Sequence, residues 1–185
     1  MRSEEEIFTP FRPLCAILTS GPSLECLDKL GQLCAEAEAT DLEIIQEYLV
    51  FPAQLHLKTR ARASPQNYTI AILDYIRALY KRIRLTSLFL FTDVLSSCLA
   101  LVSVKTNTTV TVTEDLQISI CDTIRKMIRA SVSQEDEEGH GVIFTQLLTS
   151  ADPGLKLPLS HLVFTSLEWA SEDAAPASVV LAGLR

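Results

Sequence analysis

Apolar residues recur three or four positions apart in nine separate segments of this sequence, and almost no stretch alternates apolar and polar residues as a half-buried strand would. We therefore expect an all-α fold. The expected helices span residues 3–19, 23–36, 41–57, 66–84, 86–102, 113–128, 142–148, 155–170 and 174–185.

Several boundaries of these segments have local signals. Ser3 and Glu6 have the spacing of a capping box, and Ser23 can cap the second helix after the Gly21-Pro22 break. Pro10 and Pro13 fall inside the first segment and could move its true start to Thr9. We expect loops at 58–65 and 135–139, a loop or extended segment at 106–113, and a turn at 152–154.

Pro52 lies within an apolar run, where a proline costs a helix about 3 kcal/mol. The helical register gives this segment two apolar rows, so we expect a kinked, buried helix whose Tyr48, Phe51 and Leu55 pack on adjacent helices. A strand at 53–57 is the competing interpretation. The first row is Leu42, Ile45 and Leu49, and the second is Ile44, Tyr48, Phe51 and Leu55.

Helix pairs that start near residues 23, 66 and 114 are separated by 43 and 48 residues. This spacing is close to the roughly 40–47 residues of HEAT and armadillo arrays, and it favours an α-solenoid over a closed bundle. We expect residues 1–185 to form a single N-terminal segment of such a solenoid. The last segment reaches the final residue without a cap, so we also expect the solenoid to be truncated at its C-terminus.

Composition indicates a folded, soluble protein, since 48% of the residues are hydrophobic and no run approaches the roughly 18 uncharged apolar residues of a membrane span. The start, MRSEEE, is acidic where a secretory signal would be basic and then apolar. The expected compartment is the cytoplasm, with the nucleus as a second location. The five cysteines show no C-x-x-C spacing, so we expect buried free thiols rather than metal ligands.

The formal net charge is −7, yet residues 58–84 carry seven basic residues against Asp74. The overall charge disfavours a general affinity for nucleic acid. Arg77, Lys81 and Arg84 lie at i, i+4 and i+7, where a helix would present them on one face to an acidic partner. A solvated helix face, partly neutralised by Asp74, is the alternative.

Residues suited to catalysis are few and scattered. His56, His140 and His161 have no metal-ligand spacing, and we expect His56 to be a surface residue or a core residue with its hydrogen bond satisfied. The phosphate-binding pattern G-x-x-x-x-G-K-[ST] is absent from the sequence. We therefore expect no catalytic site, no cofactor and no metal, and a role in binding other proteins.

Two segments carry a family resemblance. "FRPLCAILTS" (11–20) and "EYLVFPAQLHLKT" (47–59) closely resemble the N-terminal region of Tel-two-interacting protein one, and weaker similarity continues at 113–131 and 157–173. The residues that carry the match are Arg12, Pro13, Cys15, Tyr48, Phe51, Pro52, Leu57 and Lys58.

The resemblance implies a HEAT-repeat solenoid that acts as a non-enzymatic scaffold. Such a scaffold, with the Tel-two protein and the second Tel-two-interacting protein, forms the TTT co-chaperone complex. That complex supports the folding, stability and assembly of phosphatidylinositol-3-kinase-related kinases together with chaperone machinery, and so serves TOR signalling and the DNA-damage response. Family members are several times longer than this chain, so the resemblance implies an N-terminal fragment, a short isoform or an incomplete gene model. A different HEAT or armadillo adaptor that reads an acidic partner is the alternative function.

Overall fold

The computed structural model describes residues 3–102 and 112–131, and this part of the chain contains eight helices and no strand. The all-α prediction is confirmed. The helices are α1 (Glu4–Phe8), α2 (Arg12–Ser20), α3 (Leu24–Glu36), α4 (Ala39–Ile44), α5 (Gln46–Thr59), α6 (Gln66–Arg82), α7 (Leu88–Val102) and α8 (Glu114–Ser131).

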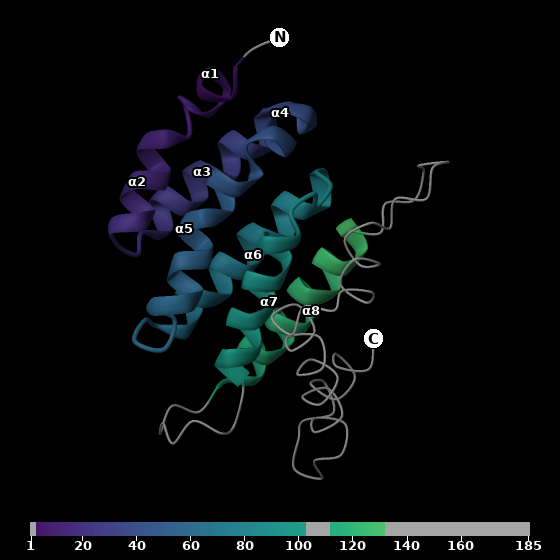
Figure 1. The fold of residues 1–185 in the computed structure, drawn as a ribbon. Coiled ribbons are helices and arrows are strands. Elements are labelled where there is room, and N and C mark those ends of the chain that lie inside the picture. Colours follow the sequence, from purple (N-terminus) through teal and green to yellow (C-terminus); the bar gives the residue numbers. More distant parts are fainter. Residues whose placement is uncertain (1–2, 103–111, 132–185) are drawn as a thin grey trace.

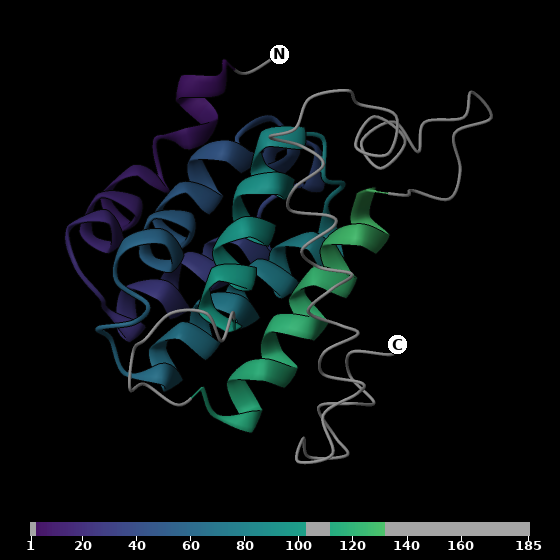
Figure 2. The same cartoon turned by 60° about the horizontal axis from the view of Figure 1, so that its bottom comes forward.

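Six of the helices form two layers, with α2, α5 and α7 in one layer and α3, α6 and α8 in the other (Figure 1). Consecutive helices pair across the layers as α2–α3, α5–α6 and α7–α8, and α8 lies at one edge of the stack in both views (Figures 1 and 2). Each pair packs mainly on the next pair, which is the arrangement of an α-solenoid. The predicted solenoid is confirmed.

Side-chain hydrogen bonds show that neighbours within a layer run in parallel. Gln46, at the start of α5, bonds to Thr86 just before α7, and Gln54, further along α5, bonds to Asp93 within α7. In the other layer, Gln66 at the start of α6 meets Thr113 just before α8. The two helices of each pair therefore run in opposite directions, as in an antiparallel hairpin, while helices of the same layer run in the same direction.

Most of the core follows the apolar spacing that the sequence predicts. Leu42, Ile45 and Leu49 are fully buried, with 0% of each residue exposed. The rows of α6, α7 and α8 are buried in the same way, except that Leu88 and Ile128 are only partly buried. Those buried residues are Ile72, Ile76, Leu79, Ile83, Phe91, Leu95, Leu99, Leu116, Ile120, Ile124 and Met127.

The first expected helix is divided in two. The capping box is confirmed, since the Ser3 hydroxyl accepts from the Glu6 N–H while the Glu6 carboxylate accepts from the Ser3 N–H. Pro10 has no N–H to continue α1, and Pro13 falls in the first turn of α2, where an N–H would lack a helical partner anyway. The prediction of one continuous helix over 3–19 was wrong for this reason.

The third expected helix is also divided, at Ile45 rather than at Pro52. Its first part begins at Ala39 instead of Asp41, and the backbone leaves helical geometry at Ile45, where φ is −104° and ψ is 13°. Pro52 lies buried inside α5, so the competing strand at 53–57 was wrong. A bend at Pro52 stays a prediction.

The burial expected for Tyr48 and Phe51 was wrong. Tyr48 is 48% exposed and Phe51 is 52% exposed, while Leu55 is partly buried. Helix α5 has α2 and α7 on either side and α6 behind it, and no other described helix packs closely on its fourth side. The second apolar row falls on that side, although the Tyr48 ring does contact Phe8, with 4.9 Å between ring centroids.

Other boundaries differ slightly. Helix α5 continues into the expected loop as far as Thr59, and α7 begins at Leu88 instead of near Thr86. Within the described residues, no helix is long and apolar enough to cross a membrane. The expectations for most of 106–113 and for all segments after residue 131 lie outside the described part of the chain.

Candidate functional site

The basic stripe predicted on α6 begins with Arg77, which is turned toward α8. Its guanidinium donates to the carbonyl and the hydroxyl of Ser119, each at 2.8 Å, and to the Thr123 hydroxyl at 3.3 Å. It also pairs with Asp74, one turn earlier on α6. Burial lowers the pKa of Arg77 from its usual value. Arg77 therefore links two helices of one layer.

The other two members of the stripe, Lys81 and Arg84, are exposed. Arg84 follows the end of α6, and its backbone N–H donates to Glu43 at 2.9 Å. Between them, Arg82 donates to the backbone carbonyls of Cys34 and Ala37 at the C-terminal end of α3. Arg82 thus caps α3, as a cation near free helix carbonyls does. Of the predicted basic stripe, Lys81 and Arg84 are therefore exposed, while Arg77 is engaged with α8.

The two segments that carry the family resemblance are neighbours in space. The first is centred on α2 and the second on α5, and these helices pack side by side in one layer (Figure 1). In the first segment, Arg12 and Pro13 are exposed and Cys15 is buried. Arg12 pairs with Glu5 at 3.3 Å and its guanidinium lies 5.8 Å from the centroid of the Phe8 ring.

Among the motif residues of the second segment, Pro52 and Leu57 are buried, while Tyr48, Phe51 and Lys58 reach the surface. Lys58 forms an ion pair with Asp93 of α7 at 2.6 Å. The motif therefore includes both core residues that hold α5 in its layer and side chains available to a partner.

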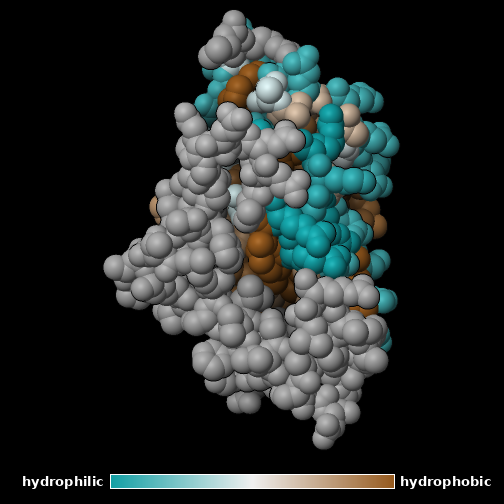
Figure 3. All heavy atoms as spheres, turned by 90° about the vertical axis from the view of Figure 1, so that its right-hand side faces the viewer, coloured by the Kyte–Doolittle hydropathy of each residue, from teal (hydrophilic) through white to brown (hydrophobic). Residues whose placement is uncertain are grey.

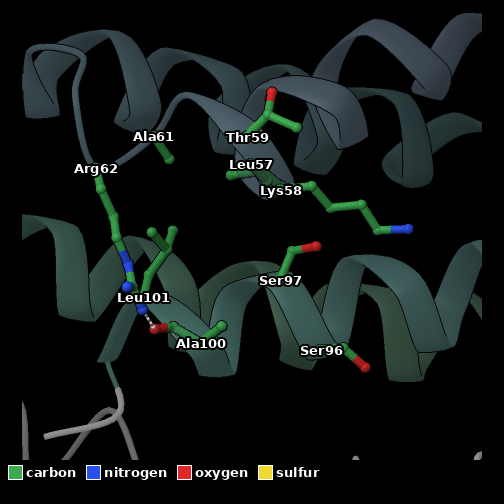
Figure 4. Close-up of a pocket in the computed structure, with 9 residues that line it drawn as sticks. All are labelled: Leu57, Lys58, Thr59, Ala61, Arg62, Ser96, Ser97, Ala100 and Leu101. Carbon is green, nitrogen blue, oxygen red and sulfur yellow. Dashed lines mark hydrogen bonds between the residues drawn. The ribbon is translucent and has the colours of Figure 1, made fainter. Parts of the chain in front are cut away.

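A groove of about 430 Å³ lies between the C-terminal parts of α5 and α7 (Figure 4). Arg62 crosses it to donate to the carbonyl of Ala100 at 2.8 Å. The two cations of the groove, Lys58 and Arg62, already have partners, and Ser96 and Ser97 contribute hydroxyls. The groove therefore has neither a nucleophile beside a base nor a group of metal ligands. Its lining residues are Leu57, Lys58, Thr59, Ala61, Arg62, Ser96, Ser97, Ala100 and Leu101.

Large apolar side chains are exposed on the outer side of α4, α5 and α7. We call this set the apolar patch; it consists of Ile44 (51% exposed), Tyr48 (48%), Phe51 (52%) and Phe89 (79%). Sequence periodicity missed it, because a row of apolar residues looks the same whether or not a neighbouring helix covers it. The side that carries α8 offers a different surface: its described part is mostly hydrophilic, with a narrow hydrophobic band (Figure 3).

His56 is a core residue whose hydrogen bond is satisfied, which is one of the two environments expected for it. It is 3% exposed, its Nε2 lies 3.3 Å from the Thr69 hydroxyl, and its ring meets Tyr68 edge to face at 4.8 Å. Burial, with a smaller contribution from the charge of Arg60, lowers the pKa of His56 to about 4. It is therefore neutral near pH 7 and unsuited to donating a proton there.

The low pKa of His56 predicts a pH-dependent stability. An unfolded histidine has a pKa near 6.5, so the unfolded chain binds the proton more tightly between pH 6.5 and about 4. The free energy of unfolding should fall as the pH drops through this window, by about 3 kcal/mol in total. Urea denaturation at pH 7 and pH 4.5 measures the loss, and His56→Gln should reduce it markedly. Equal losses in both proteins would rule out this role for His56.

The cysteines of the described residues are free thiols, as predicted. Cys15, Cys34 and Cys98 are buried, and Cys26 and Cys121 are partly buried. Burial raises the pKa of Cys34 and Cys121 to about 11 and that of Cys15 and Cys98 to about 12. Thiols that stay protonated are poor nucleophiles and poor metal ligands. No group of three potential metal-ligating side chains occurs among residues 3–102 and 112–131.

The comparisons with known proteins identify a family. The family model described as the TTI1 N-terminal TPR domain matches residues 8–178, which is most of the chain and includes both resemblance segments. No curated protein and no solved structure matches the chain. TPR and HEAT repeats are both stacks of helix pairs, so the match agrees with the two layers described above. The chain therefore belongs to the TTI1 N-terminal TPR domain family.

Proposed function

We propose that this chain is a protein-binding scaffold that works in a TTT-type co-chaperone complex and supports the folding, stability and assembly of phosphatidylinositol-3-kinase-related kinases. The observation that carries the proposal is the family match over residues 8–178. In this proposal, its direct partners are the Tel-two protein and the second Tel-two-interacting protein, and it reaches kinases and chaperone machinery through them. Its compartment is the cytoplasm, with the nucleus as a second location.

The geometry of the described residues supports binding rather than catalysis. Families of helical repeats are typically non-catalytic scaffolds, and here several polar side chains are committed to helix packing. Arg77 and Arg82 hold helices together, and His56 is neutral in the core. Mechanistically, the stack presents rigid helix faces to partners, and binding energy alone does the work.

The proposal also treats residues 1–185 as one solenoid segment. The longer family members distribute their contacts over a longer array, so this segment would supply part of the binding surface. Its share includes the exposed motif residues Tyr48, Phe51 and Lys58.

Affinity purification of the tagged chain from cells, followed by mass spectrometry, tests the proposed function. We expect the Tel-two protein to be recovered with the wild-type chain. A Leu49→Asp variant places a charge at a fully buried position and should recover only general chaperones. Failure of the wild-type chain to recover the Tel-two protein, while it is folded and abundant, would contradict the proposal.

A basic helix face that reads an acidic partner is the second candidate, because Lys81 and Arg84 are exposed. Arg77 does not belong in a test of this face, since its loss would also remove hydrogen bonds between α6 and α8. The double variant Lys81→Glu, Arg84→Glu in the same purification separates the two functions. Loss of every acidic partner, with the Tel-two protein retained, would favour a separate adaptor role for this face.

A further inference from the structure

We propose that the apolar patch is the docking site for an amphipathic helix of a partner protein, and that this helix carries lysine and arginine beside its apolar side chains. The inference rests on the proposed function only in requiring a protein partner. It adds where that partner binds and what chemistry it must present.

The patch lies on α5 and α7, which are neighbours in one layer, and on the end of α4 that adjoins α5. Tyr48 and Phe51 lie at i and i+3, which places them on one side of α5, and Ile44 is the last residue of α4, just before the break at Ile45. Phe89 is placed beside them by the parallel register of α5 and α7. Phe51 is one turn before Gln54, Phe89 is one turn before Asp93, and Gln54 bonds to Asp93.

The dimensions of the patch suit a helix. Tyr48 and Phe51 are about one turn apart on α5, and Ile44 precedes them across the break at Ile45, so the row can contact about two turns of a docked partner helix. All four side chains are about half exposed or more, and two are phenylalanines and one a tyrosine. Aromatic anchors of this kind contribute much of the binding energy in protein interfaces.

Carboxylates lie beside Tyr48 at one end of the patch. A hydrogen bond from the Tyr48 hydroxyl to Glu4, and the negative charge of Glu4, raise the pKa of Tyr48, and Glu47 adds a smaller contribution. The α1 helix that carries Glu4 also carries Glu5 and Glu6, all of them exposed. A partner that buries these rings must bring positive charge to the same place.

The chain itself contains an example of this chemistry. Arg12 lies over the Phe8 ring at 5.8 Å and pairs with Glu5 at 3.3 Å, while the same Phe8 ring contacts Tyr48. A guanidinium that stacks on an aromatic ring beside a carboxylate gains both a cation–π contact and an ion pair. Arginines of a docked helix could repeat this contact on Tyr48 or Phe51, with Glu47 and Glu4 as the acids.

Charge also disfavours two other occupants of the apolar patch, namely residues 132–185 and a second copy of the chain. Residues 132–185 are rich in Asp and Glu and contain Lys156 and Arg185 as their only lysine and arginine, so this segment would bring like charge to an acidic rim. A second copy docked through the same patch would oppose Glu4 and Glu47 to their own equivalents. Like charges across an interface suppress association, so a basic partner helix is the occupant that fits.

Fluorescence anisotropy with purified chain and two labelled probe peptides tests the proposal. The first probe is a designed amphipathic helix of about 18 residues with leucines on one face and lysine and arginine beside them. The second probe has glutamate at every basic position. We expect the basic peptide to bind at least about tenfold more tightly than the acidic one, and more weakly as salt is added.

Variants of exposed residues locate the binding site without threatening the core. The double variant Phe51→Ala, Phe89→Ala should lower affinity for the basic peptide at least about tenfold, and Glu47→Gln should lower its salt dependence. Leu24→Ala is the matched control, because Leu24 is 46% exposed at the start of α3 in the other layer, and it should leave binding unchanged. Circular dichroism of each variant confirms that it remains folded.

Three outcomes would overturn the proposal: binding of neither peptide, equal binding of both, or undiminished binding by the Phe51, Phe89 double variant. Light scattering adds a fourth, since concentration-dependent dimerisation that the double variant abolishes would identify a second copy as the occupant. Each of these can occur while the chain still recovers the Tel-two protein through another face. Failure here is therefore distinguishable from failure of the proposed function.

Discussion

Replacement of Leu49 by alanine should lower the free energy of unfolding by about 2–5 kcal/mol, the cost of leaving a cavity in a packed helical core. Leu49 is 0% exposed and lies in the row that faces the neighbouring helices. Its carbonyl also accepts a hydrogen bond from the buried Tyr75 hydroxyl at 3.1 Å, which ties α5 to α6. Urea denaturation monitored by circular dichroism gives the difference.

The adjacent residue supplies the matched control. Tyr48→Ala removes a larger side chain from the same helix, yet Tyr48 is 48% exposed, so we expect a loss below about 1 kcal/mol. Equal losses for the two variants would mean that the outer side of α5 is covered after all. That result would contradict both the burial described above and the apolar patch.

Replacement of Arg77 by methionine should lower the free energy of unfolding by about 2–3 kcal/mol. The variant keeps most of the side-chain length but loses the charged hydrogen bonds to Ser119 and Thr123, and bonds to a charged group are worth more than neutral ones. Arg77→Lys should recover part of the loss, because an ammonium keeps the charge but lacks the planar fork that reaches several acceptors.

Lys81→Met is the control for Arg77, since Lys81 lies one turn further along α6 and is exposed. It should change stability by less than about 0.5 kcal/mol. A similar small effect at both positions would show that Arg77 is dispensable for packing and would return it to the predicted partner-binding stripe. Thermal or urea denaturation of the three variants in parallel decides between these roles.

Sequence periodicity predicted the helices well because burial in a helical stack repeats with the helix itself. The buried rows of α6, α7 and α8 follow the spacing read from the sequence closely. The spacing between helix pairs also predicted the solenoid, since a chain of antiparallel hairpins must return to the same layer at regular intervals.

The division of two helices was harder to predict. At Pro10 a local signal existed, because a missing N–H interrupts the hydrogen-bond ladder, but a proline can also be accommodated, as Pro52 is in α5. The break at Ile45 involves no proline or glycine. Nothing in the residues around Ile45 distinguishes it from a helix interior, so only tertiary packing can place that break.

The exposure of the candidate surface residues could not be predicted from any single segment, because it depends on which helices pack together. Whether Phe51 is covered depends on which sides of α5 have neighbours, and whether Arg77 is free depends on where α8 lies. The family resemblance was more informative than the charge spacing, because its two segments proved to be α2 and α5 of one layer. The motif residues of the two segments are far apart in sequence, but they lie on two helices that pack against each other.

Direct binding between purified components tests the central claim, that the folded chain acts as a scaffold by binding alone. The chain, the Tel-two protein and the second Tel-two-interacting protein are mixed and analysed by size-exclusion chromatography with light scattering. We predict a complex with the mass of the combined components, formed without any added nucleotide, metal or other cofactor. If a chain that is helical by circular dichroism elutes alone in every mixture, the scaffold account of this protein is contradicted.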